Sequence, residues 1–360
     1  MSSFFGGGPA ALTPGIAERR NLVAKLEAAR GTKVLVYVTS TRPNLESPLA
    51  MDVLPIIYRH LATMGDAALA GGIDVLIHTN GGEGIVPWRL LQLLRSFSGR
   101  VSVLVPHLAY SGGTLMALGA DEVVMHRMGT LGPIDPTVNS WFNPPHPDLP
   151  GRRLGISVED LASFFDFIRD DVALGDGAEA VQAVAALLQQ VHPLALGSVK
   201  RSTLQSRMLG KRLLIQGGMH DAGDLDAVVE RLASELYSHG HPISPREART
   251  ELGLAHVTEA PDDVAVLMWR IYESFAAEMQ LEDAFDVVEL MSGGHPLPLP
   301  EPQQLVRQQK PLGPYPVALV ESAVRADAFE LLFDGVITRG WDGAVSTNLT
   351  LVKAAWTQRA

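Results

Sequence analysis

The sequence of 360 residues contains no cysteine. Disulfide bonds, thiolate metal sites and a cysteine nucleophile are therefore excluded. Lysine is also scarce, because Lys200 and Lys211 are the only lysines between residues 34 and 309. No run of basic residues occurs and the formal net charge is −11, so a nucleic-acid-binding surface is not expected.

Long apolar runs are missing as well. No stretch reaches the ~20 residues that a membrane-spanning helix needs, and the N-terminus lacks the basic segment and apolar stretch of a secretory signal. A Walker-type phosphate loop is absent too, so we expect no ATPase activity of the chain itself. Together these absences predict a cytoplasmic protein and make any unfoldase a separate partner.

Apolar, β-branched segments alternate with helical patterns along the first part of the chain. Strands that alternate with helices indicate an α/β fold with a mostly parallel sheet, and near-continuous apolar strands indicate covering helices on both faces. The predicted strands cover residues 33–40, 73–78, 101–106 and 122–125. The predicted helices between them cover residues 51–61, 88–97 and 111–119.

The pattern divides the chain into three regions. Residues 1–32 are predicted to form an N-terminal arm and a helix, and residues 33–281 the α/β domain, with a helical insertion at about 157–190. Residues 282–360 read as a Pro-rich linker followed by a C-terminal strand pair. The two strands of this pair are predicted at residues 316–324 and 329–338.

Two of the buried strands end in a glycine-containing turn, HTNGGE at 78–83 and AYSGGT at 109–114. A serine at a strand-to-helix turn is held by rigid backbone and faces the free N–H groups and positive end of the helix. The amides of Gly82 and Gly112 are two donors that could hold an oxyanion. Ser111 is therefore the candidate nucleophile, although both glycine pairs would also permit close helix–sheet packing.

The stretch AYSGGTLMALGADEVVMHRMGTLGPIDP at 109–136 resembles the serine dehydrogenase proteinase family, relatives of signal peptide peptidase A in the Clp/crotonase superfamily. Its LGPIDP ending is the most specific part, and SPREARTELGL at 244–254 is similar to a late helix of the Clp peptidases. The resemblance implies a Clp/crotonase-like fold and a serine endopeptidase without a cofactor. It also implies peptide or unfolded-protein substrates, a homo-oligomer, and a separate unfoldase or membrane partner.

The resemblance assigns the nucleophile to Ser111 and the oxyanion donors to Gly82 and Gly112. Where the Clp peptidases carry a histidine base, this sequence has Asp135, which could orient a base or bind substrate. The relatives of signal peptide peptidase A use a lysine near the start of the next long helix, which matches Lys200.

A lysine acts as a base only when it is neutral, and burial or a nearby cation such as Arg201 would lower the pKa of Lys200. His192 is the alternative base, because a histidine needs no large pKa shift to accept a proton at neutral pH. His239 and His241 form the only close histidine pair, and since a third ligand is not evident, no metal site is predicted.

Two other functions fit the same pattern. A crotonase-like acyl-CoA enzyme would use a similar backbone oxyanion hole for a thioester enolate, but it would not need the serine at the turn. A catalytically degenerate scaffold would keep the fold and a peptide-binding groove, and the missing histidine at position 135 is consistent with it. The serine and the LGPIDP segment favour the peptidase.

Overall fold

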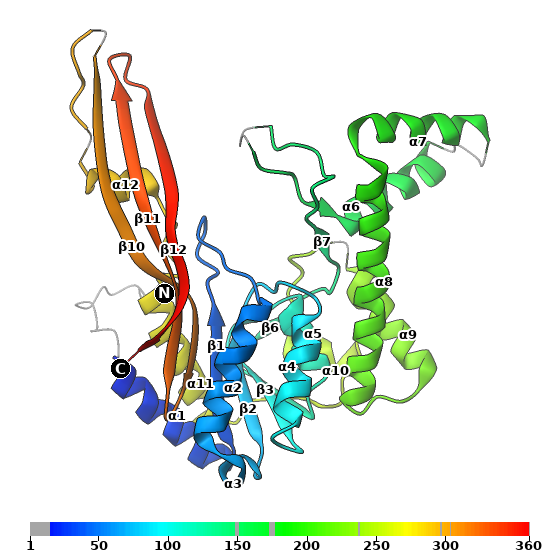
Figure 1. The fold of residues 1–360 in the computed structure, drawn as a ribbon. Helices are drawn as coiled ribbons and strands as arrows, with labels where there is room; N and C mark the ends of the chain where they lie inside the picture. Colours follow the sequence, from blue (N-terminus) through cyan, green and yellow to red (C-terminus); the bar gives the residue numbers. More distant parts are fainter. Residues whose placement is uncertain are drawn as a thin grey trace, which may run out of the picture.

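The structure, a computed structural model, describes residues 15–147, 151–172, 177–236, 238–295, 297–302 and 304–359. Its centre is an eight-stranded sheet with the order β12-β11-β10-β1-β2-β3-β5-β9 (Figure 1). The strands from β1 to β9 in this order are parallel to one another, as predicted. They are β1 (Lys33–Thr39), β2 (Ile73–His78), β3 (Val101–Val105), β5 (Glu122–Met125) and β9 (Val257–Glu259).

Alternate residues of the parallel strands point to opposite faces of the sheet. Val34, Val36 and Val38 pack in one apolar cluster with α1 (Ile16–Arg30) and α11 (Asp262–Met279). Their neighbours on the other face join a larger cluster with helices from both halves of the chain. These helices include α2 (Leu54–Met64), α4 (Val86–Arg95), α5 (Gly112–Leu118) and α8 (Pro193–Gln216).

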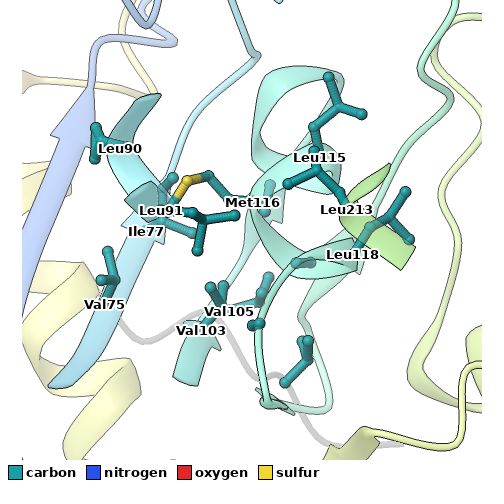
Figure 2. Close-up of a cluster of buried hydrophobic side chains, with 14 of the residues drawn as sticks. Val75, Ile77, Leu90, Leu91, Val103, Val105, Leu115, Met116, Leu118 and Leu213 are labelled. Carbon is teal, nitrogen blue, oxygen red and sulfur yellow. The ribbon is translucent and has the colours of Figure 1, made fainter. Parts of the chain in front are cut away.

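The larger cluster fixes α5 against the sheet. Figure 2 shows Met116 and Leu118 of α5 lying toward the side chains of β2 and β3, and Leu115 beside Leu213 of α8. All four side chains are at most 3% exposed. The start of α5 is therefore held at the carboxyl end of the parallel strands, where ligand sites of α/β sheets gather.

The predicted helical insertion is present as an arm beside the sheet (Figure 1). It contains α6 (Val158–Asp166), one π-helical turn (Phe167–Asp171) and α7 (Ala178–Gln190). Val158 packs with Val199 of α8 and with Val138 in a small separate cluster. Along the described parts of the chain, no helix combines the length and apolar character needed to cross a membrane.

The C-terminal region differs from the predicted linker and strand pair. It contains three long antiparallel strands, β10 (Leu305–Ser322), β11 (Ala326–Gly340) and β12 (Val345–Arg359). Pro311 and Pro314 suggested a linker, but they lie inside β10, where the pairing with β11 is irregular between Leu312 and Tyr315. β10 also pairs with β1, so these strands extend the central sheet.

The remaining elements are short or connect the larger ones. The connecting helices are a 3-10 turn (Met51–Val53), α3 (Asp66–Leu69), α9 (Ala222–Glu230), a π-helical turn (Arg231–Glu235), α10 (Pro245–Thr250) and α12 (Val287–Ser292). The short strands are β4 (Leu108–Ala109), β6 (Thr130–Leu131), β7 (Thr137–Val138) and β8 (Ile156–Ser157).

A buried histidine joins α2 to the C-terminal strands. The ring of His60 is fully buried and lies 2.9 Å from Ser322 Oγ and 3.0 Å from Asp327 Oδ2. Burial lowers the pKa of His60 to about 4. The negative charge of Asp327 acts in the opposite direction but is partly neutralised by Arg325, so the effect of burial is the larger one. The folded state therefore holds His60 neutral at a pH at which the unfolded chain would protonate it.

Acidification should destabilise the fold through this group. The neutral His60 does not lower the free energy of unfolding above about pH 6.5, the pKa of a histidine in the unfolded chain. As the pH falls from there toward the pKa of His60 in the folded state, the unfolded chain takes up a proton that the folded state does not, and the folded state loses stability. Between pH 7 and pH 5, His60 alone should lower the free energy of unfolding by about 2 kcal/mol. Urea denaturation at both pH values should show a smaller acid-induced loss in His60→Gln than in the wild type, and equal losses would contradict this account.

Candidate active site

Ser111 lies between β4 and α5 in a strained backbone conformation, with φ 49° and ψ −105°. A positive φ is uncommon for a residue with a side chain, and such outliers concentrate at functional sites. The side chain is half-buried, and its Oγ has no hydrogen-bond partner among the described residues. The backbone N–H of Gly112, the first residue of α5, likewise donates to no acceptor among the residues that the structure describes.

The turn after β2 lies directly against Ser111. A Cβ on Gly81 would come within 2.6 Å of Ser111 Cβ and 3.0 Å of its Oγ, so only glycine fits there. Gly81 also has φ +103°, a conformation that favours glycine. A Cβ on Gly112 would lie 3.6 Å from Gly82 N, so the two candidate oxyanion amides are neighbours.

Hydrogen bonds on both sides hold the Gly81-Gly82 turn. Leu49 N donates to Gly81 O at 2.7 Å, and Glu83 N donates to Leu49 O at 2.9 Å. Gly81 N donates to the buried hydroxyl of Thr79 at 3.0 Å, which in turn accepts a hydrogen bond from Thr39 Oγ1 at 2.8 Å. These contacts leave Gly82 N without an acceptor in the described structure, free to donate to a bound group.

Ser111 opens into a cavity of about 580 Å³. Its walls come from the Gly82 turn, from residues 134–139 and from α8. Apolar side chains lie beside polar ones, so the cavity can accept both the side chain and the main chain of a peptide. The apolar contributors are Pro48, Leu115, Ile134, Pro136, Val138 and Leu209, and the polar ones include Asn80, Ser202, Gln205 and His239.

A histidine and an aspartate pair at the edge of this cavity. His239 Nδ1 lies 2.8 Å from Asp135 Oδ1, and Asp135 is only 3% exposed. Because an ionised carboxylate only accepts hydrogen bonds, the neutral ring carries its proton on Nδ1 and leaves the Nε2 lone pair free. The hydrogen bond that His239 donates to Asp135 raises the pKa of His239 above its usual value, against the opposing effect of burial.

The loop that carries Asp135 is pinned from three sides. The buried hydroxyl of Thr114 on α5 lies 2.8 Å from Gly132 O and accepts from Gly132 N at 3.0 Å. Ser206 of α8 donates to Ile134 O at 2.6 Å, and Ile134 N donates to Leu232 O at 2.9 Å. The helix that follows Ser111 and the loop that carries Asp135 are thereby held in a fixed relation.

The two bases expected from the sequence lie elsewhere. Lys200 is exposed on α8 and does not line the cavity. It is two residues from Ser202, or about 200° around the helix, on the side away from the cavity. His192 caps α8 by accepting a hydrogen bond from Leu194 N at 3.1 Å, and its exposed ring stacks on Phe142.

In the sequence, His239 stands out only as a possible metal ligand together with His241. The structure separates the pair, because His241 Nε2 lies 2.9 Å from Glu247 Oε1 while His239 faces Asp135. One feature of the sequence pointed toward such a residue: Asp135 stands where the Clp peptidases have a histidine base, and a buried acidic residue needs a basic partner. No local sequence pattern, however, identifies His239 as that partner.

Comparison with known proteins agrees with the resemblance. Residues 13–146 match the family model described as the ClpP-like SDH-type serine proteinase, so the predicted family resemblance and α/β fold class are confirmed. Two uncharacterized proteins of Methanocaldococcus jannaschii are similar. One is 28% identical over 54% of this chain and 57% of its own length. The other is 27% identical over 35% of this chain and 44% of its own.

The chain thus spans about half the length of these relatives. Among solved structures, the 1510-N membrane-bound stomatin-specific protease, in a mutant form, aligns with a TM-score of 0.39 and 14% sequence identity. That alignment covers 66% of this chain and 85% of the other.

The close approach of Gly81 to Ser111 can be tested with an alanine substitution. Gly81→Ala should slow labelling of Ser111 by a fluorophosphonate probe about a hundredfold, because the new Cβ displaces the turn that carries Gly82. Gly84→Ala is the matched control, since a Cβ there meets nothing within 4 Å. Equal labelling rates in two variants with wild-type circular dichroism would contradict the proposed geometry.

Proposed function

We propose that the protein is a serine endopeptidase that hydrolyses peptide bonds through an acyl-enzyme on Ser111. The observation that carries the proposal is the strained Ser111 at the start of α5, with an unpaired Oγ next to the free amides of Gly82 and Gly112. Nucleophile and oxyanion donors then share one cavity wall, as acyl transfer requires. The match of residues 13–146 to a serine proteinase family supports this chemistry.

The geometry supports His239 as the general base. Its Nε2 lone pair is available, its cavity is that of Ser111, and Asp135 holds the ring in the tautomer needed to accept a proton. No direct hydrogen bond joins His239 to Ser111. Unliganded sites often have longer catalytic contacts, and a bound substrate or one water between the two groups would complete the path.

The reaction then follows in balanced steps. Ser111 Oγ bonds to the substrate carbonyl carbon as its proton passes to His239 Nε2, and the oxyanion accepts hydrogen bonds from Gly82 N and Gly112 N. The carbon–nitrogen bond breaks while His239 returns the proton to the leaving amine. Water then attacks the ester and gives a proton to His239, which returns it to Ser111 as the carboxylic acid leaves.

The remaining expectations from the family are part of the same proposal. The open cavity, lined by both apolar and polar groups, suits a peptide or an unfolded protein. A cytoplasmic location is proposed from the sequence alone. A homo-oligomer and a separate unfoldase or membrane partner are proposed from the resemblance alone. Two other versions of the mechanism differ only in the general base that takes the proton of Ser111. The base is Lys200 in one of them and His192 in the other.

Labelling with a fluorophosphonate probe distinguishes these bases. Ser111→Ala should abolish labelling, and His239→Gln should slow it at least about a hundredfold, because the serine loses its proton acceptor. Asp135→Asn should slow it less, and Lys200→Ala and His192→Ala should label like the wild type. Loss of labelling in Lys200→Ala with retention in His239→Gln would return the base to Lys200, and an unlabelled wild type would favour the scaffold or acyl-CoA alternatives.

The pH dependence provides an independent check. His239 accepts a proton only when neutral, so kcat/KM for a peptide ester should rise with pH through a midpoint above about 6.5. In Asp135→Asn the carboxylate no longer raises the pKa of His239, and the midpoint should move to lower pH. An unchanged midpoint in this variant would show that another group controls the reaction.

A further inference from the structure

A second cleft, of about 860 Å³, lies between the C-terminal strands and the segment that follows β1. Its apolar floor consists of Leu45, Phe285, Phe333 and Leu349. Leu45 and Phe285 are 8% and 4% exposed, and the ring centroids of Phe285 and Phe333 are 6.3 Å apart. These side chains belong to segments far apart in the sequence, and they form one packed cluster in which Phe333 and Leu349 are only partly buried.

The walls of the cleft are fixed to one another. Phe285 N donates to Pro43 O at 2.8 Å, and Arg42 Nε donates to Asp283 O at 2.8 Å. The guanidinium of Arg42 also lies over the ring of Phe285, 5.3 Å from its centroid. The segment after β1 is therefore anchored to the chain before α12, and the cleft is part of the fold.

The rim combines exposed apolar and charged side chains. Leu351 of β12 is 53% exposed and Val288 of α12 is 44% exposed. Glu46 and Asp286 carry negative charges at the rim and Arg152 a positive one. An apolar floor with charges of both signs around it suits a polypeptide with mixed side chains better than a uniformly apolar or anionic ligand.

The segment that follows β1 lines both this cleft and the cavity of Ser111. Glu46 borders the cleft and Pro48 the cavity, and two residues of chain span at most about 7 Å. A chain bound at Ser111 that leaves on this side therefore reaches the cleft across the segment after β1.

The cleft lies over one face of β12, the edge strand of the sheet. β12 is the last strand in the sheet order, and no described strand pairs with its outer edge. Thr347, Leu349 and Leu351 alternate along β12 and point to the cleft. An extended chain that lies along this row can place its own apolar side chains between Leu349 and Leu351.

We propose that this cleft is an exosite that binds an extended, partly apolar segment of the same polypeptide whose peptide bond is cut at Ser111. The inference rests on the proposed peptidase function and deepens it, because it makes unfolded chains better substrates than short peptides. β12 then contributes to substrate selection through Leu349 and Leu351, and α12 through Val288, without taking part in the chemistry.

The test compares a short and a long substrate. A short peptide ester that fills only the cavity of Ser111 is measured beside fluorescein-labelled casein, an unfolded protein. The double variant Leu351→Gln/Val288→Gln removes apolar rim contacts at exposed positions, where the fold should tolerate glutamine. The matched control is Val352→Gln/Val266→Gln, because Val352 and Val266 are 59% and 58% exposed and do not line the cleft.

The cleft variant should raise KM for casein about tenfold, equivalent to about 1.4 kcal/mol of binding, and leave kcat/KM for the ester unchanged. Binding of labelled casein to Ser111→Ala, followed by fluorescence anisotropy, should weaken by a similar factor when the cleft substitutions are added. This second measurement needs no catalysis.

Each outcome bears on a definite claim. A wild type that does not hydrolyse the ester would overturn the proposed peptidase function. The anisotropy measurement would still test whether the cleft binds casein. A wild type that cuts both substrates, with casein KM and affinity equal in the cleft and control variants, would overturn the exosite alone. A parallel loss for ester and casein would also overturn it, since the substitutions would then act on the whole fold.

Discussion

The close approach of two backbone turns is the constraint on which the rest of the site depends. Gly81 lies so near Ser111 that no side chain fits between them, and the serine itself adopts a positive φ. Such a conformation persists only where the surroundings over-determine it. Here the surroundings are α5, packed over β2 and β3, and the turn after β2, which is tied to Leu49 and Thr79.

The parallel sheet converts this local constraint into a cavity. Its strands end at one edge, so the turns after β2 and β3 meet there, and the loop with Asp135 follows from β6. Thr114 and Ser206 then fix that loop to α5 and α8. The result places a nucleophile, two free amides and a histidine–aspartate pair around one space, although these groups come from four separate segments.

Local patterns in the sequence were sufficient for the parallel strands β1, β2, β3 and β5, the main helices and the two glycine turns, but not for β9. The spacing of apolar residues predicts these features from short stretches of sequence, and the side chains predicted to be apolar and inward-facing are buried in the structure. His239 could not be predicted in this way, because its contact with Asp135 depends on how α8, α9 and the π-helical turn fold back on the loop. Lys200 was a reasonable candidate by position, but which face of α8 meets the cavity is decided by tertiary packing. The third C-terminal strand was missed because residues 345–359 mix apolar and polar side chains and have no buried face to mark them.

A crystal structure with a peptide boronate would test the central claim most directly. The account predicts a covalent bond from Ser111 Oγ to boron, one boronate oxygen about 3 Å from both Gly82 N and Gly112 N, and His239 Nε2 in contact with the adduct. A boronate bound away from Ser111, or an adduct in which Lys200 takes the place of His239, would contradict it.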